Sequence, residues 1–514
     1  MDALKTFSAI RPATLAAVRT TEYRFQRCPY GISPNPHGNL SNSTAEFPGD
    51  DPVHNTNLTA LRRFVLNNNK NKLTLHSNPS TSVRKNIAST SGDAWNSEQR
   101  LSAGVIKTGT LPNGLRIISN LVPYVHSITL GIWINAGSRE DPQGLEGLAH
   151  FIEHAVFKGT IRRDYVEIAR CIEKTGGYID AWTTKEQTCI YVRCLREHLP
   201  VAFDLLADLV CNPVFPPEEI VKEKEVVLEE ISSVNDTPEE LIFEDFDRRS
   251  FPAHPLGTAI LGTEQSVGAI TEENLRSFMR EHYVPEKMLI TAVGNIDHDE
   301  LTSIASSCLG NLRQPSPGSP QRKLFDLSDY SPFKATLKKS VCQAQILIGT
   351  VFPRDDANFW GLMVLNTMLS SGMSSILNLE LREKRGLVYQ AYSSIAFLDE
   401  ITTFNIYAGT DKGKTANTLD TIAALFSEGS LMEPDQAELK AAKAKMLGSL
   451  IMGMEKMTQR MSHFAQDIFY TGNYMSPAEK ASLIEAVTSD DVAAAVVKLG
   501  IPTLLSTLVY KPSR

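Results

Sequence analysis

The feature that most constrains this 514-residue chain is a succession of expected strands and helices that occurs twice. The first copy has a β-rich apolar strand, a helix, a second strand and a second helix, at residues 127–136, 146–158, 190–195 and 199–210. The second copy repeats this order at residues 344–349, 358–369, 404–408 and 418–426. The interval is roughly 200 residues, enough for one domain per copy. We therefore predict an α+β fold with two homologous α/β domains.

Two segments outside these copies differ in composition. The stretch Pro315–Pro320 reads PSPGSP, which is typical of an exposed linker. We therefore expect a first domain at 105–312, a linker at 313–330 and a homologous second domain at 331–514. Residues 1–104 are rich in Asn, Ser, Thr and Pro, which predicts a mostly disordered N-terminal extension. The arginine-rich first thirty residues resemble a mitochondrial targeting segment, but a disordered tail or a start codon placed too far upstream fits equally well.

The bulk properties exclude some classes of protein. A formal net charge of -8 argues against a nucleic-acid-binding protein. No run of 18 or more apolar residues occurs, so we expect no membrane span and a soluble chain. The seven cysteines are irregularly spaced and form no CxxC pair, which favours a reduced compartment without a disulfide framework.

The most informative chemical motif is His150-Phe-Ile-Glu153-His154, within the expected helix at 146–158. Since His150 and His154 are four residues apart, both imidazoles lie on one face of a helix and can bind one zinc ion. Glu153 lies beside them and can take a proton from water, the role that it has in HxxEH peptidases. An ordinary helix with solvent-facing histidines is the alternative. A hydrolytic zinc ion needs a third protein ligand, which we expect from a downstream carboxylate.

The charged helix expected at 218–233 contains the candidates for this third ligand. It carries Glu223, Glu225, Glu229 and Glu230 after a start at Pro216-Pro217. The spacing of these residues does not choose among them. For most of the four, an exposed helix face is the simpler interpretation.

The sequence GLAHFIEHAVFKGT at Gly147–Thr160 resembles the pitrilysin/insulinase family of zinc peptidases, and more closely its processing-peptidase branch. TLPNGLR at 110–116 matches a further stretch of that family. The resemblance implies one zinc ion per chain, held by His150, His154 and Glu230. It also implies that Glu223 supports the ligands from outside the metal's own coordination shell.

The same resemblance implies substrate-binding residues. Asp180 and Ala181 lie where the family has a strand that pairs with the substrate backbone, although the family usually has Asn at the position of Asp180. Asp accepts hydrogen bonds but cannot donate as an amide does. In LREKRGLVY at 381–389, Arg382 and Tyr389 match a pair that reaches the active site from the zinc-free half. There the Arg holds the substrate backbone and the Tyr stabilises the oxyanion.

These residues predict a zinc-dependent metalloendopeptidase that hydrolyses unfolded peptides or flexible protein termini. The resemblance implies two domains, each a mainly antiparallel sheet packed with helices, that form a clamshell. The domain at 105–312 would be the catalytic zinc-binding one, and the zinc-free domain at 331–514 would contribute substrate-binding residues. The alternatives are a non-catalytic structural or substrate-binding subunit of a related complex, and a different metal hydrolase with the same ligands. The family implies a homodimer or a heterodimer with a related subunit. The wording of residues 381–393 is closer to bacterial relatives, which favours the cytoplasm, with the mitochondrial matrix as the alternative.

Overall fold

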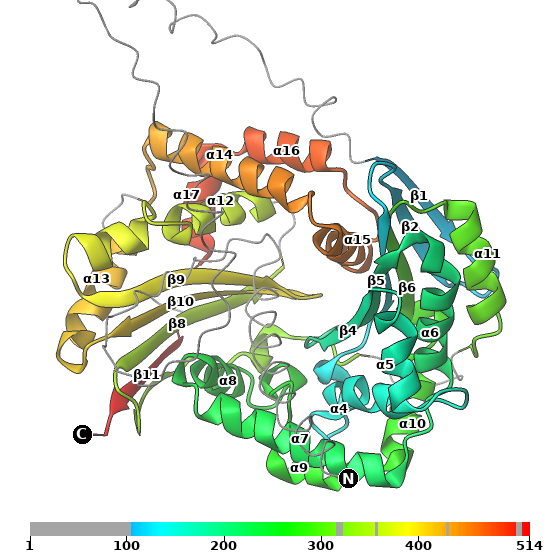
Figure 1. Ribbon diagram of the computed structural model, residues 1–514. Helices are drawn as coiled ribbons and strands as arrows, with labels where there is room; N and C mark the ends of the chain where they lie inside the picture. The colour runs from blue at the N-terminus through cyan, green and yellow to red at the C-terminus, as the bar shows by residue number, and fades with distance from the viewer. Residues whose placement is uncertain (1–103, 315–321, 355–357, 428–430, 500–505, 514) are drawn as a thin grey trace, which may run out of the picture. The chain divides into compact units, whose positions relative to one another are not determined.

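The described residues of the computed structural model are 104–314, 322–354, 358–427, 431–499 and 506–513. Apart from Gly104, the predicted N-terminal extension lies outside them, and so does the Pro-rich stretch at 315–320. All described residues belong to one compact unit. Their strands form two sheets (Figure 1). Within these ranges, no helix has the length and apolar character needed to cross a membrane.

The first sheet has the strand order β1-β2-β6-β3-β5-β4. Its strands are β1 (Val105–Thr110), β2 (Arg116–Leu121), β3 (Ser127–Ile134), β4 (Tyr178–Thr183), β5 (Thr188–Leu195) and β6 (Met288–Gly294). β2 and β6 are parallel, and all other neighbours are antiparallel. β3 and β5 confirm the strands predicted at 127–136 and 190–195. The turn that joins β1 to β2 contains Gly114, whose φ of 92° suits glycine.

The described residues 104–314 contain eight α-helices, which are interspersed with these strands along the chain. They are α4 (Leu148–Ala155), α5 (Tyr165–Glu173), α6 (Leu199–Cys211), α7 (Pro217–Asn235), α8 (Pro238–Ser250), α9 (Glu264–Ala269), α10 (Glu272–His282) and α11 (His298–Leu309). α6 packs on β3 and β5, and α4 packs on β4, within one large apolar core. The helices predicted at 146–158, 199–210 and 218–233 are confirmed as α4, α6 and α7.

The second sheet has the strand order β7-β11-β8-β10-β9. Its strands are β7 (Lys334–Lys339), β8 (Ala344–Pro353), β9 (Val388–Phe397), β10 (Ile401–Thr410) and β11 (Ser506–Pro512). The helices here are α12 (Phe359–Ser370), α13 (Thr415–Ser427), α14 (Gln436–Gly453), α15 (Met457–Thr471), α16 (Pro477–Ala486) and α17 (Ser489–Lys498).

The predicted internal duplication is visible in the sheet topology. The order β2-β6-β3-β5-β4 of the first sheet corresponds to β7-β11-β8-β10-β9 of the second, and the strands enter both sheets in the same chain order. In each sheet the single parallel pair is the corresponding one, β2 with β6 and β7 with β11. The fold class is therefore confirmed as two homologous α/β halves with mainly antiparallel sheets.

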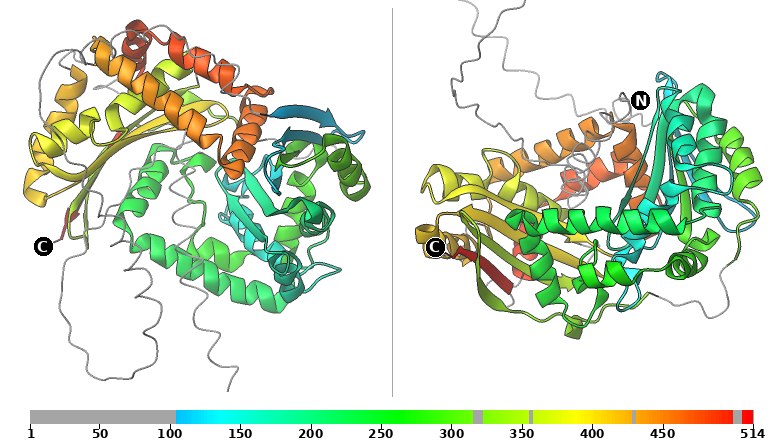
Figure 2. Two further views of the ribbon diagram at one scale, coloured as in Figure 1. Left: turned by 45° about the horizontal axis from the view of Figure 1, so that its top comes forward. Right: turned by 60° about the horizontal axis from the view of Figure 1, so that its bottom comes forward.

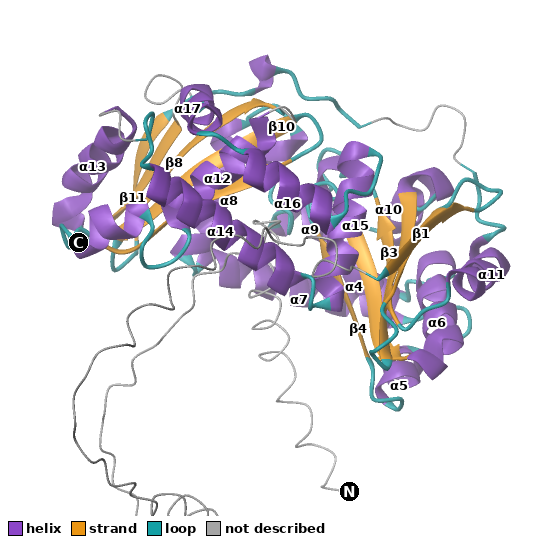
Figure 3. Cartoon of the chain, turned by 90° about the horizontal axis from the view of Figure 1, so that it is seen from above, coloured by secondary structure: helices purple, strands orange, loops and turns teal. Residues whose placement is uncertain are grey.

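Two helices pack on the sheet of the other half, which the sequence pattern did not predict (Figures 2 and 3). α15 lies against β3 and β6, where Phe464 and Met461 pack with Trp133. α8 lies against β8 and β11, where Phe246 packs with Leu347. Each half thus contributes apolar side chains to the core of the other.

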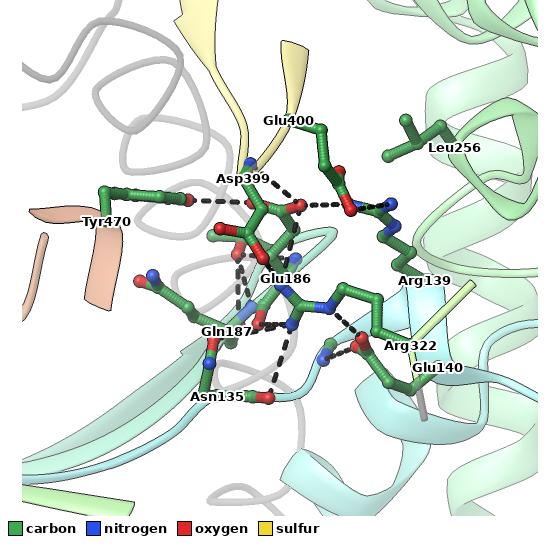
Figure 4. Close-up of polar contacts among 12 residues, drawn as sticks. Asn135, Arg139, Glu140, Glu186, Gln187, Leu256, Arg322, Asp399, Glu400 and Tyr470 are labelled. Atoms are coloured by element: carbon green, nitrogen blue, oxygen red, sulfur yellow. Dashed lines mark hydrogen bonds and ion pairs between the residues drawn. The ribbon is translucent and has the colours of Figure 1, made fainter. Parts of the chain in front are cut away.

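A largely buried cluster of polar side chains also joins the two halves (Figure 4). We call it the junction cluster, and it comprises Arg139, Glu140, Glu186, Arg322, Asp399, Glu400 and Tyr470. Arg139 donates to Glu186 and to Glu400, which follows β9. Arg322 donates to Glu140, and the hydroxyl of Tyr470 donates to Glu186 over 3.1 Å. Since buried charges are costly unless they are paired, this cluster ties the β4–β5 turn to the β9–β10 turn and to the end of α15.

Candidate metal centre

The start of α4 is held by backbone geometry and by one carboxylate. Gly147 precedes the helix with a φ of 95°, and a Cβ atom there would lie 2.5 Å from the carbonyl oxygen of Leu261. The backbone N–H groups of Gly147 and Ala149 donate to Asp141 over 2.7 and 2.8 Å. A carboxylate at a helix N-terminus satisfies backbone donors that have no partner within the helix. Only glycine fits at position 147, because a side chain there would clash with the backbone at Leu261.

α4 gathers the three residues of the predicted motif. Every residue of this helix is buried. His150, Glu153 and His154 each offer a ligand atom, and these atoms all lie within 4.8 Å of one another. The two imidazole rings have centroids 4.7 Å apart. The i, i+4 spacing thus places both rings on one face, as the sequence indicated.

Glu230 reaches the two histidines from α7, which packs on α4. Its Oε2 atom lies 3.7 Å from Nε2 of His150 and 3.5 Å from Nε2 of His154. Two ligands of a tetrahedral zinc ion, with bonds of about 2.0–2.1 Å, are separated by about 3.4 Å. The two nitrogen-to-oxygen separations therefore fit a zinc ion that Glu230 shares with both histidines. Glu225 and Glu229 are exposed on the opposite side of α7, so they take no part in this arrangement.

Glu223 also faces the histidines, from two turns earlier on α7. Its Oε2 atom lies 3.0 Å from Nδ1 of His154, and its Oε1 atom forms an ion pair with Lys158. Burial by itself raises the pKa of Glu223, but the hydrogen bonds with His154 and Lys158 outweigh burial and lower it. The carboxylate is therefore ionised and fixes His154 through the nitrogen that faces away from Glu230.

Asp180 and Ala181 lie on β4, which pairs with β5 and is the edge strand of the first sheet. α4 packs directly against this strand. The Oδ1 atom of Asp180 accepts a hydrogen bond from the backbone N–H of Ala181 over 2.9 Å, and Tyr191 donates to Oδ2 at 3.5 Å. The sheet edge formed by β4 thus lies beside the metal centre. The role of Asp180 and Ala181 in substrate binding stays a prediction.

Arg382 and Tyr389 lie in the second half, and the described contacts do not join them to the histidines. Arg382 is in a short π-helix (Asn378–Glu383) and pairs with its neighbour Glu383 at 3.8 Å. Tyr389 is near the start of β9, is 75% exposed, and lines a polar cavity of about 230 Å³ together with Glu239 and others. Their roles toward a substrate stay predictions.

Two further residues at the centre were not singled out from the sequence. Lys158 pairs with Glu223, and its position four residues after His154 was the available signal. Tyr283 follows α10 and is buried in the same core as α4. Burial and then the charge of Glu153 raise the pKa of Tyr283, so its phenol is neutral. No local pattern marks Tyr283, because only the packing of α10 on α4 brings it near.

Comparisons with known proteins place this chain in a family. Residues 116–264 match the family described as Insulinase (Peptidase family M16), and residues 269–446 match the Peptidase M16 inactive domain. An uncharacterized zinc protease of Mycobacterium leprae is 35% identical over 395 residues, 76% of this chain and 88% of that protein. An uncharacterized zinc protease of Bacillus subtilis is 31% identical over 389 residues, 76% of this chain and 94% of that protein.

Solved structures share the fold. A protease from Helicobacter pylori superimposes with a TM-score of 0.73 at 21% identity, covering 80% of this chain and 100% of that chain. The structure of a peptidase M16 inactive domain from Pseudomonas fluorescens gives a TM-score of 0.73 at 21% identity, covering 80% of this chain and 98% of that chain. The duplicated sheet arrangement is thus common to these chains.

Proposed function

Because this chain belongs to the insulinase family of peptidases (family M16), we propose that it is a zinc-dependent metalloendopeptidase acting on unfolded peptides or flexible protein termini. The observation that carries the proposal is the convergence of His150, His154 and Glu230 around one point, with Glu153 beside them. Three protein ligands leave one position of a tetrahedral ion open, which is the arrangement of a hydrolytic rather than a structural site.

One zinc ion would be held by the Nε2 atoms of His150 and His154 and by the carboxylate of Glu230. When bound there, zinc supplies Lewis acidity, which activates a water molecule and polarises the scissile carbonyl. Glu153 takes the proton from the attacking water and passes it to the leaving amine. Glu223 accepts a hydrogen bond from Nδ1 of His154, so that Nε2 carries the free lone pair.

The surroundings of the metal centre suit an extended peptide as the substrate. β4 is an edge strand, and an edge strand binds a peptide through backbone hydrogen bonds whatever the peptide's side chains. Asp180 and Ala181 lie in this strand, beside α4. In the proposed reaction, Arg382 holds the substrate backbone and Tyr389 stabilises the oxyanion from the second half. The dimer and the cytoplasmic location inferred from the sequence stay predictions.

The decisive experiment separates metal binding from proton transfer. The zinc-loaded chain should cleave a quenched fluorescent peptide, and Glu153→Gln should keep its zinc while kcat falls roughly 10²–10⁴-fold. Glu229→Gln, which removes an exposed carboxylate from α7, is the control and should keep full activity. Full activity of Glu153→Gln would reject the mechanism. Failure of the zinc-loaded wild type to cleave any peptide would favour the non-catalytic alternative.

A further inference from the structure

The carboxylate of Glu223 bridges two side chains that leave the same helical segment. Lys158 ends a short 3₁₀ turn (Val156–Lys158) that continues α4, so it lies one turn beyond His154. One oxygen of Glu223 meets the ammonium group of Lys158, and the other lies 3.0 Å from Nδ1 of His154. The side chain of Glu223 is 6% exposed and that of Lys158 is 27% exposed. The three groups form a series of polar contacts, here called the bridge, from the edge of the site to a histidine ligand.

In the bridge, Lys158 restricts the orientation of Glu223, and Glu223 restricts that of His154. For Nε2 of His154 to face the metal, Nδ1 must carry the proton and needs an acceptor in the plane of the ring. Glu223 provides that acceptor, but a carboxylate on a glutamate stem can rotate about several bonds. A cation bound to the second oxygen removes this freedom. A charged donor also makes a stronger hydrogen bond than a neutral one, so the constraint is effective.

We propose that Lys158 is a positioning residue for zinc binding, which holds Glu223 in the orientation that fixes the imidazole of His154 toward the metal. This inference rests on the proposed function and adds a residue to it. In the described part of the chain, Lys158 forms its ion pair with Oε1 of Glu223, whereas Nδ1 of His154 lies beside Oε2. It therefore acts through Glu223 alone.

A second Lys–Glu pair on α7 provides a matched comparison. Lys222 pairs with Glu219 over 2.5 Å, and the side chain of Lys222 is 64% exposed. Exposed pairs of this kind contribute little to stability. In the described part of the chain, the hydrogen bond and the ion pair of Lys222 are with Glu219. Removing Lys222 thus changes the charge near α7 by the same amount without touching the bridge.

The experiment measures the zinc dissociation constant of the full chain by competition with a chromophoric chelator. Lys158→Met should weaken zinc binding about 10-fold, the lower end of the effect of losing an outer-shell partner itself, because Glu223 remains but is no longer held in place. Lys158→Arg should recover most of the affinity, because a guanidinium also donates to a carboxylate. Lys222→Met should bind zinc as the wild type does. Circular dichroism and thermal unfolding of the zinc-free variants show that each remains folded.

Two further measurements test whether Lys158 acts through Glu223. The double variant Lys158→Met/Glu223→Gln should bind zinc no more weakly than Glu223→Gln alone, because the two changes interrupt the same bridge. At saturating zinc, Lys158→Met should regain a kcat close to that of the wild type, which a general structural defect would not allow.

The results that would overturn the inference differ from those that would overturn the peptidase function. Wild-type zinc affinity in Lys158→Met, or additive losses in the double variant, would reject the positioning role of Lys158 even in an active peptidase. Conversely, a wild-type protein that binds zinc but cleaves no peptide would reject the peptidase function. The zinc affinities of the variants would still test the positioning role of Lys158. A wild-type chain without zinc affinity would reject both.

Discussion

Replacing Glu186 with glutamine should strongly destabilise the protein, although this residue belongs to the junction cluster and not to the metal centre. Its side chain is 1% exposed. Its carboxylate accepts hydrogen bonds from Arg139, from the hydroxyl of Tyr470 and from the backbone N–H of Asp399. Glutamine keeps the shape of the side chain but removes the negative charge that faces the buried guanidinium of Arg139.

The size of the effect follows from burial. Removing one partner of a buried ion pair costs about 3–5 kcal/mol, because the other charge remains buried without compensation. Arg139 keeps a second partner, Glu400, at 2.7 Å, so we expect a loss near 3 kcal/mol. At about 1.4 kcal/mol per factor of ten, the ratio of unfolded to folded protein rises more than 100-fold.

Urea unfolding followed by tryptophan fluorescence measures this loss. Trp133 and Trp182 lie in the core that the first sheet shares with α15, so their emission reports on the contact between the two halves. Glu197→Gln is the control, since the side chain of Glu197 is 74% exposed. The reasoning is refuted if Glu186→Gln unfolds at the urea concentration of the wild type. It is equally refuted if Glu197→Gln loses as much free energy of unfolding.

Two further predictions concern the metal ligand and the pH dependence. Glu230→Gln should lose bound zinc by metal analysis, whereas Glu225→Gln, on the exposed face of α7, should keep it; equal zinc contents would reject Glu230 as a ligand. Asp208 concerns the pH dependence: burial raises its pKa, but hydrogen bonds led by that from Thr160 outweigh burial and lower it. Since the pKa is lower in the folded than in the unfolded chain, the stabilisation is complete above the unfolded pKa and is lost as the pH falls through the folded pKa. Asp208→Asn should therefore show a smaller decrease in melting temperature than the wild type between about pH 5 and pH 3, and equal decreases would contradict this explanation.

Local patterns were sufficient for several elements of each half. The apolar run at 127–136 and the helical spacing at 199–210 correspond to β3 and α6, because periodicity reports which face of an element is buried. The duplicated order of elements also predicted two related sheets. The exchange of α8 and α15 was not predictable in this way. An amphipathic helix shows that it has an apolar face, but not which sheet covers that face.

The metal centre was likewise predictable from the sequence only in part. From the sequence alone, His150 shares a helix face with Glu153 and His154, because residues three and four apart on a helix are neighbours. Resemblance, not spacing, selected Glu230 and Glu223 from the four glutamates of α7. Only the tertiary structure decided which glutamates face α4, and it alone added Lys158 to the bridge that ends at His154. Which side of a helix faces a partner that is distant in the sequence depends on how the two helices pack. The local sequence of either helix does not set this rotation.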